Sequence, residues 1–168
     1  MRLLVCDDDA AIMVMLGVAL DGVEVVEASR QAEAERIAAG GRLDGAVVDR
    51  RLPDGDGLTL VKFIRREPRT ADIPIVVLTA GFRPEDIEVV LAAGADEYVG
   101  KPVEPLELAD LINRLGLLSD RDRLVRRTLR RARAKAGQHV GGWDDLPEMP
   151  KAADPSRKAR RKARRQQQ

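Results

Sequence analysis

The sequence predicts an α/β fold, a five-stranded parallel sheet doubly wound with helices, followed by a basic C-terminal tail. Through residue 118, short apolar runs alternate with stretches of helical periodicity. Five βα units in series favour a parallel sheet with right-handed crossovers and helices on both faces. Charge marks the tail: residues 119–168 hold 16 basic and six acidic residues, a net charge of +10, whereas residues 1–118 carry −9.

The predicted strands are short and apolar, as expected of strands that are buried on both faces of a sheet. They cover residues 3–6, 23–28, 46–49, 75–79 and 97–99. The single cysteine, Cys6, lies in the first strand, where we expect it to behave as a small buried hydrophobe. One cysteine excludes an internal disulfide framework and a cysteine-cluster zinc site.

Helical spacing of apolar residues marks the segments between and after the strands. Asp9 is placed to cap the first helix, and Gly40-Gly41 to end the second. Pro84 opens the fourth helix, as proline does in a first helical turn. Pro105 lies near the start of the fifth.

The fifth helix is predicted to continue into the tail. Leu111, Leu118, Val125 and Ala132 recur every seven residues, so an arginine-rich helix is expected to run to about residue 135. Beyond it the chain is rich in Gly, Pro, Asp and Arg, which predicts disorder. We therefore divide the chain into a domain at residues 1–118 and a basic extension at residues 119–168.

Polar residues close four of the five predicted strands. Asp7-Asp8 follow the first, Asp49 ends the third, Thr79 ends the fourth and Lys101 follows the fifth. In a doubly wound sheet the functional site lies at the carboxyl ends of the strands. The topology is therefore expected to bring these side chains to one edge.

Those residue types suit phosphoryl chemistry. Crowded carboxylates take up protons or hold a cation, and hard oxygen ligands suit Mg²⁺. A carboxylate beside Mg²⁺ can attack phosphorus, while Lys101 and Thr79 could hold the phosphoryl oxygens. Each residue alone is explained as well by a cap, a turn or a loop, but four complementary groups at four strand ends together favour a phospho-acceptor site.

Residues 1–118 resemble the receiver domain of bacterial two-component response regulators. The matching segments are residues 3–9, 47–49, Leu52-Pro53 with Asp56-Gly57, residues 76–80, 94–98 and Lys101-Pro102. Their order and spacing cover the whole domain. The resemblance implies a flavodoxin-like sheet with strand order 2-1-3-4-5.

The resemblance also implies a chemistry. Asp49 would accept a phosphoryl group from the phosphohistidine of a sensor histidine kinase or phosphotransfer protein. Asp8, Asp49 and the backbone carbonyl of Arg51 would ligate Mg²⁺, and Asp7 would act through water. Such a protein is not an enzyme beyond its own phosphotransfer and autodephosphorylation.

A switch is implied as well. Thr79 and Lys101 would contact the phosphoryl oxygens, and Tyr98 would follow the movement of Thr79. The surface of helix 4, strand 5 and helix 5 would then change for a downstream protein partner or a homodimer. The Lys101-Pro102 bond is expected to be cis.

Two arginines near the site depart from the pattern that is usual in the family, and one glycine flanks the site. Arg50 and Arg51 follow Asp49, where an apolar residue and then a variable one are more common. We expect Arg50 to face solvent. For Arg51 two interpretations stay open, exposure to solvent or contact with the phosphoryl group. Gly81 is expected to leave the other flank of the site open to water.

The function of the tail stays open from sequence. It is either a solvated appendage or docking arm, a nonspecific binder of nucleic acid or another acidic surface, or a segment that folds back on the acidic domain as an autoinhibitory contact. The first is favoured because charge runs are usually solvated. A phosphorylation-independent scaffold is a further alternative, and a Mg²⁺-dependent phosphatase is disfavoured because the loops are too short to build a cap.

The sequence contains no apolar run long enough for a membrane span, and its N-terminus does not resemble a signal peptide. We therefore expect a cytoplasmic protein with no membrane partner.

Overall fold

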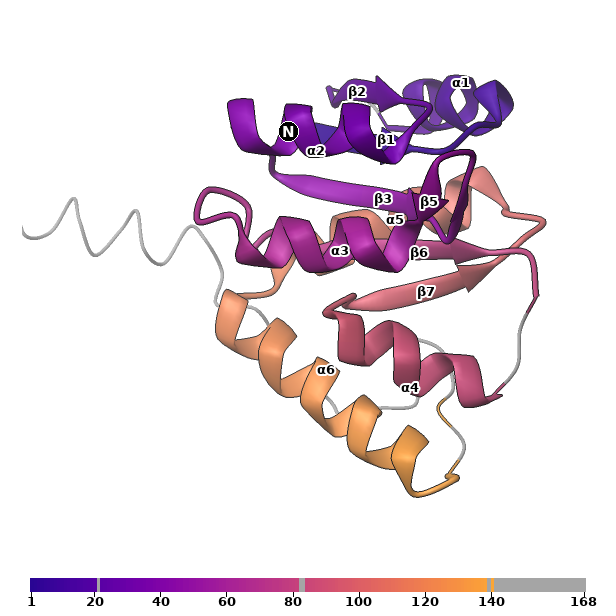
Figure 1. The fold of residues 1–168 in the computed structure, drawn as a ribbon, viewed down its shortest axis with the longest axis vertical. Coiled ribbons are helices and arrows are strands. Elements are labelled where there is room, and N and C mark those ends of the chain that lie inside the picture. The colour runs from indigo at the N-terminus through magenta and orange to yellow at the C-terminus, as the bar shows by residue number, and fades with distance from the viewer. Residues whose placement is uncertain (21, 82–83, 139, 141–168) are drawn as a thin grey trace, which may run out of the picture.

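The computed structural model describes residues 1–20, 22–81, 84–138 and 140, which form an α/β fold with an additional C-terminal helix (Figure 1). The order of elements is β1 (Arg2–Cys6), α1 (Ala10–Ala19), β2 (Glu24–Ala28), α2 (Gln31–Gly40), β3 (Gly45–Asp49), β4 (Arg51–Leu52), β5 (Gly55–Asp56), α3 (Gly57–Arg66), β6 (Ile75–Thr79), α4 (Pro84–Ala93), β7 (Glu97–Gly100), α5 (Pro105–Leu117) and α6 (Asp120–Lys135).

Five strands form one parallel sheet in the order β2-β1-β3-β6-β7. These are the five predicted strands, so the predicted order 2-1-3-4-5 is confirmed. A short antiparallel pair, β4 and β5, lies in the loop after β3 and was not predicted. The order reverses direction between β1 and β3, so the carboxyl ends of these two strands flank the point where a site is expected.

Helices cover both faces of the sheet. On one face, α1 and α5 bury Leu16, Leu108 and Ile112 against Leu3 and Val76. On the other face, α2, α3 and α4 pack against the sheet (Figure 1).

Cys6 is buried as predicted, and burial raises the pKa of its thiol to about 12.

Local signals place the helix ends close to where the sequence puts them. The carboxylate of Asp9 accepts a hydrogen bond from the amide of Ala11 and caps α1. The second helix has an unpredicted cap: Asp54, from the loop between β4 and β5, accepts the amides of Gln31 at 2.7 Å and Ala32 at 3.1 Å. Two orphan amides of α2 are thereby satisfied from another loop.

The extension is helical to Lys135, close to the predicted end, but the prediction that the fifth helix continues into it is wrong, because the chain breaks into two helices. α5 ends at Leu117, and Leu118 and Ser119 are extended. The Ser119 hydroxyl accepts the amide of Asp122 at 3.1 Å, and two aspartates lie in the first turn of α6. A serine cap with acidic residues after it is a strong start signal, and it outweighs the seven-residue apolar spacing.

The described part of the extension folds back on the domain. α6 lies beside α4, at the β7 edge of the sheet (Figure 1). The predicted disorder beyond about residue 135 falls mostly outside the described residues, which include only residues 136–138 and 140 of that segment. Among the helices in the described ranges, none combines the length and the apolar character that crossing a membrane requires.

Candidate functional site

Three of the predicted site residues form one hydrogen-bonded group at the carboxyl edge of the sheet. The Lys101 ammonium, just after β7, donates to Oδ2 of Asp7 at 2.8 Å and to Oδ2 of Asp49 at very short range. Asp7 follows β1 and is fully buried, and Asp49 ends β3 and is 7% exposed. Residues separated by up to 94 positions in the chain thus meet in one cluster.

Burial and pairing shape the acid–base properties of this group. Burial raises the pKa of Asp7, and the hydrogen bond from Lys101 offsets only part of that effect. Burial also works against the Lys101 ammonium, but its hydrogen bonds to Asp49 and Asp7 outweigh it and raise the pKa of Lys101. Lys101 is therefore a fixed positive charge at neutral pH.

Asp8 completes a carboxylate cluster that suits a divalent cation. One oxygen from each of Asp7, Asp8 and Asp49 lies within 4.8 Å of the others. Asp8 is exposed, whereas the other two are buried, so the cluster is closed on the protein side and open to water on the other. Three hard oxygen donors with room for water match the preference of Mg²⁺.

The backbone after β3 fixes the orientation of the Asp49 carboxylate. The amide of Arg51 donates to its Oδ1 at 2.9 Å, leaving Oδ2 for Lys101. Behind it, the amide of Gly57 donates to the carbonyl of Arg50 at 2.8 Å. A Cβ at Gly57 would lie 2.0 Å from the Asp49 carbonyl oxygen, so only glycine allows α3 to start this close. Sequence reasoning used Gly57 only as part of a motif.

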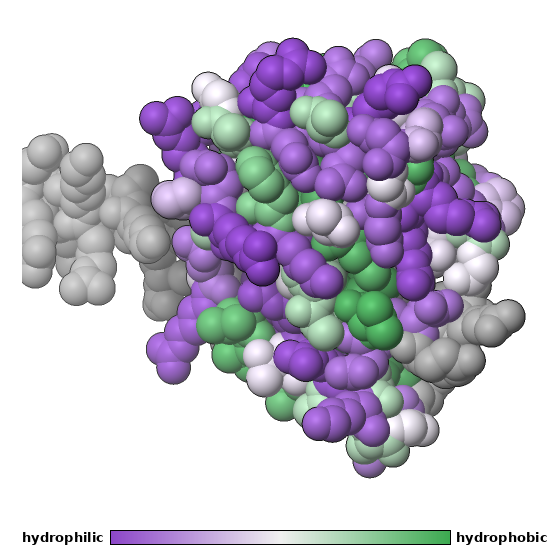
Figure 2. Space-filling model, viewed as in Figure 1, coloured by the Kyte–Doolittle hydropathy of each residue, from purple (hydrophilic) through white to green (hydrophobic). Residues whose placement is uncertain are grey.

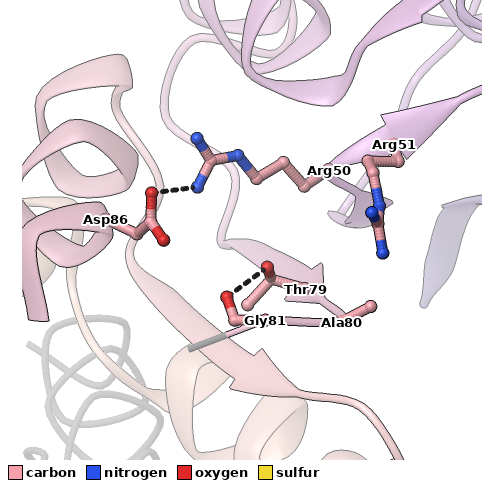
Figure 3. Close-up of a pocket in the computed structure, with 6 residues that line it drawn as sticks. All are labelled: Arg50, Arg51, Thr79, Ala80, Gly81 and Asp86. Atoms are coloured by element: carbon pink, nitrogen blue, oxygen red, sulfur yellow. Dashed lines mark hydrogen bonds and ion pairs between the residues drawn. The ribbon is translucent and has the colours of Figure 1, made fainter. Parts of the chain in front are cut away.

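A cavity opens between the residues that follow β3, the end of β6 and the start of α4 (Figure 3). It is lined by Arg50, Arg51, Thr79, Ala80, Gly81 and Asp86. The hydroxyl of Thr79 donates to the carbonyl of Gly81 at 3.1 Å, so it is held at the cavity wall. The expectation that the Gly81 side of the site is open fits this cavity.

The two arginines after Asp49 behave differently. Nη1 of Arg50 donates to Oδ1 of Asp86 at 2.8 Å, and their side chains are only 25% and 29% exposed. The prediction that Arg50 faces solvent is therefore wrong, because an acidic partner from α4 draws it across the cavity. Arg51 is exposed and lies on the opposite side of the cavity (Figure 3).

Tyr98 lies on β7 and faces the C-terminal helix. Its hydroxyl donates to the carbonyl of Val140 at 3.0 Å, and the guanidinium of Arg130 lies 5.3 Å from the ring centroid. Burial raises the pKa of Tyr98, although the charge of Arg130 opposes this. The Lys101-Pro102 bond that follows β7 is cis, as predicted.

The comparisons with known proteins agree with this geometry. The sequence profile described as the response regulator receiver domain matches residues 3–113. The chain belongs to this family. It is 36% identical over 108 residues to the phosphate regulon transcriptional regulatory protein PhoB of Pseudomonas aeruginosa, covering 63% of this chain and 47% of that protein. It is 39% identical over 119 residues to the transcriptional regulatory protein PrrA of Mycobacterium bovis, covering 70% and 49%.

Solved receiver structures superpose on the same part of the chain. A putative response regulator from Chloroflexus aurantiacus is 34% identical, with a TM-score of 0.64, covering 70% of this chain and 98% of that one. The receiver domain of a sensor histidine kinase from Pseudomonas aeruginosa, described with a magnesium ion coordinated in its active-site cleft, is 30% identical, with a TM-score of 0.62, covering 68% and 96%. The chain spans about half the length of the curated relatives it matches.

Sequence reasoning kept a folded-back extension open but favoured a solvated appendage, and it did not identify the ionic contacts between the extension and the receiver. It treated the arginines of the tail as solvated, yet Arg123, Arg126 and Arg130 are buried. The signal was present, because these residues are spaced three and four apart, which places them on one helical face. The acidic counterpart of Arg126 and Arg130 is Glu97, which stands in the chain immediately before Tyr98.

Proposed function

We propose that this receiver accepts a phosphoryl group on Asp49 from the phosphohistidine of a histidine kinase or phosphotransfer protein. The observation that carries the proposal is the bridging of Asp49 and the buried Asp7 by Lys101, within a cluster that also contains Asp8. This arrangement offers a carboxylate nucleophile, a fixed cation and a set of metal ligands at one point.

The chemical step is a phosphoryl transfer between two side chains. An oxygen of the Asp49 carboxylate forms a bond to phosphorus while the phosphorus–nitrogen bond to the donor histidine breaks, and the freed imidazole nitrogen keeps the electron pair and takes up a proton. Oδ1 is held by the amide of Arg51, so the carboxylate presents a defined face to the donor. Loss of the phosphoryl group to water reverses the modification.

Mg²⁺ would be held by Asp8, Asp49 and the backbone carbonyl of Arg51, with Asp7 acting through water. When bound, it neutralises charge between the carboxylates and the incoming phosphoryl oxygens. Lys101 would then turn from the carboxylates toward a phosphoryl oxygen, since its ammonium already contacts Asp49. Thr79 would exchange its hydrogen bond to Gly81 for one to the phosphoryl group.

The output would be a change of the surface formed by α4, β7 and α5, read by a downstream partner or a second copy of the chain. Tyr98 is on this surface and follows Thr79 through the paired strands β6 and β7. Several relatives are named as transcriptional regulators, which makes control of transcription one route for the output.

Binding of nucleic acid by the tail is less favoured in the described residues. Arg123, Arg126, Arg127 and Arg130 of α6 point into the protein and are engaged by carbonyl or carboxylate groups. Such arginines are not available to phosphates without release of the helix. The basic residues after 140 lie outside the described residues.

The test is the mass of the intact protein after incubation with phosphoramidate and Mg²⁺. We expect one phosphoryl adduct that does not form when EDTA is present from the start and is absent from Asp49→Asn. Asp110→Asn, an exposed carboxylate on α5, is the matched control and keeps the adduct. A folded wild-type protein that forms no adduct would support a phosphorylation-independent scaffold instead.

A further inference from the structure

The basic helix α6 is attached to β7 by buried ion pairs. Nη2 of Arg126 donates to Oε2 of Glu97 at 2.6 Å, and Arg130 contacts the other oxygen of the same carboxylate. Both arginine side chains are 2% exposed, and that of Glu97 is 4% exposed. Nη1 of Arg126 also donates to the carbonyl of Asp96 at 3.1 Å. One glutamate thus receives two guanidinium groups from one helical face.

The neighbouring Asp96 is held in the same way. Its Oδ1 accepts Arg127 of α6 at 2.9 Å, and its Oδ2 accepts Arg65 of α3 at 2.7 Å. A weaker pair, Arg131 with Glu88 at 3.6 Å, links α6 to α4. The extension therefore contacts Asp96 and Glu97, the two residues before Tyr98, and it also contacts helix α4.

Tyr98 itself is enclosed by the extension. Arg130 lies over its ring, and the Val140 carbonyl accepts its hydroxyl. Val140 in turn packs against Ile87 and Leu91 of α4. A side chain that must move when the site changes is thus fixed by residues outside the receiver domain.

α6 is attached mainly by charges, while several of its apolar side chains face solvent. Leu124, Val125 and Leu129 are 53%, 43% and 45% exposed, whereas Arg126 and Arg130 are buried. The side of the molecule that carries α4 and α6 shows apolar residues scattered among polar ones (Figure 2). A helix that served only to extend the core would bury its leucines.

Such an attachment is suited to release. Buried ion pairs contribute little net stability, because desolvation offsets most of their attraction. β7 is an edge strand, so departure of α6 would return Glu97 to water and strand no buried charge. The attached and released states can therefore lie within a few kcal/mol of each other, as a two-state switch requires.

Two connections link α6 to the phosphorylation site. The amide of Lys101 donates to the carbonyl of Thr79 at 2.8 Å, so movement of Thr79 acts on the end of β7. On the other side, the pair between Arg50 and Asp86 ties the residue after Asp49 to α4, which α6 contacts through Glu88. Both β7 and α4 are held by α6.

We propose that α6 is an intramolecular inhibitor of the α4–β7–α5 surface and that phosphorylation of Asp49 releases it. The inference rests on the proposed function. In the unmodified protein α6 covers the β7 side of this surface, and Arg130 and Val140 hold Tyr98 in place. Phosphorylation draws Thr79 toward Asp49, which changes the position of Tyr98 and weakens its contact with Arg130.

Hydrogen exchange of the full chain tests the proposal. Beryllium fluoride with Mg²⁺ serves as the phosphoryl stand-in, and a parallel sample receives phosphoramidate for intact mass. We expect amide exchange in residues 120–135 to rise about tenfold or more on loading, while α2 changes little. Asp49→Asn should show neither response.

Variants of the ionic attachment should release α6 without a ligand. Arg126→Ala combined with Arg130→Ala should raise exchange in α6 without any ligand, and Arg121→Ala, an exposed arginine of the same helix, should not. Coupling between two sites is reciprocal. If loading with beryllium fluoride weakens the attachment of α6 by some factor, then loss of that attachment in the double variant should raise the affinity for beryllium fluoride by the same factor.

The outcomes separate the two proposals. An adduct on the wild-type protein with unchanged exchange in α6 would overturn the inhibitor role and leave the proposed function intact. Absence of any adduct from the folded protein would overturn both. The wild-type comparison does not depend on the variants, so a double variant that fails to fold does not decide the question.

Discussion

The ammonium of Lys101 donates to the fully buried carboxylate of Asp7 at 2.8 Å, and it is also bonded to Asp49. This cation is the charge that allows the carboxylates to lie close together before a metal is bound. Without it, Asp7 would be a buried charge beside another of the same sign, which is unfavourable.

Removal of this ammonium is expected to destabilise the metal-free protein. Lys101→Ala should lower the free energy of unfolding by about 1–3 kcal/mol, a range reduced from that of a fully buried pair because the side chain is partly exposed. Mg²⁺ should restore part of the loss, since it supplies positive charge at the same carboxylates. Urea unfolding with and without Mg²⁺ measures both effects.

The matched control for this charge is Lys62→Ala, an exposed lysine on α3. Its unfolding free energy should change by less than about 0.5 kcal/mol. If Lys101→Ala lowers the free energy of unfolding by the same amount with and without Mg²⁺, the ammonium and the metal do not share one site.

Gly57 is expected to be intolerant of any side chain. In Gly57→Ala, the new Cβ would meet the Asp49 carbonyl oxygen at 2.0 Å and Cγ1 of Val48 at 2.9 Å, so the start of α3 or the end of β3 must shift. We expect a loss of about 1–3 kcal/mol in unfolding free energy together with slower formation of the phosphoryl adduct. Urea unfolding and intact mass measure the two.

Gly116→Ala provides the control, because a Cβ at that position in α5 meets nothing within 4 Å. Alanine is the better helix former, so this change should be neutral or stabilising by up to about 1 kcal/mol. Equal effects at both positions would mean that the close approach of α3 to Asp49 does not matter.

The pair of Arg50 and Asp86 is expected to act as a unit on the phosphoryl adduct. The ion pair closes one side of the cavity beside Asp49, at 2.8 Å between Nη1 and Oδ1. Arg50→Ala and Asp86→Ala should therefore shorten the lifetime of the adduct by similar factors, because water gains access. The double variant should lose no more than either single one. Intact mass after removal of the donor gives the decay rates.

A different result would assign Arg50 another role. If Arg50→Ala shortens the lifetime while Asp86→Ala lengthens it, Arg50 contacts the phosphoryl group directly and Asp86 only holds it back. That outcome would contradict the interpretation of the pair as a closure of the cavity.

Asp54 makes stability depend on pH through the cap of α2. Hydrogen bonds from the amides of Ala32 and Gln31 lower the pKa of Asp54. A carboxylate whose pKa is lower in the folded state contributes stability above its unfolded pKa, near 4, and this is lost as the pH falls through the folded pKa. Asp54→Asn should thus be less stable than wild type at pH 7, and the difference should shrink in acid.

Urea unfolding at a series of pH values measures this difference, with Asp110→Asn as a control. The control carboxylate lies on exposed α5 surface and caps no helix. A gap between Asp54→Asn and wild type that stays constant into acid would show that the charge of Asp54 contributes nothing to the cap.

The fold and the cluster at Asp49 were predictable because both follow from local and topological rules. Buried apolar runs give parallel strands, and parallel strands bring their carboxyl ends to one edge, so Asp49 and Lys101 meet whatever the details of the loops. The contact between Lys101 and Asp7 is a direct result of that topology.

The path of the extension was not predictable by the same rules. The seven-residue spacing of Leu118 and Val125 suggested one long helix, but Ser119 starts a new one. Charge runs are usually solvated, so burial of Arg126 depends on a counter-charge, Glu97, that only the tertiary structure places beside it. The spacing of the arginines places them on one helical face, but it does not say which carboxylate that face meets.

Phosphorylation of Asp49 can be tested by locating the phosphoryl group in the chain. Borohydride reduces an aspartyl phosphate to homoserine, which tandem mass spectrometry can assign to one position after proteolysis. We expect reduction at Asp49 alone, dependent on Mg²⁺ and on the phosphoryl donor. Reduction at Asp7 or Asp8, or an unreduced adduct on another residue type, would contradict it.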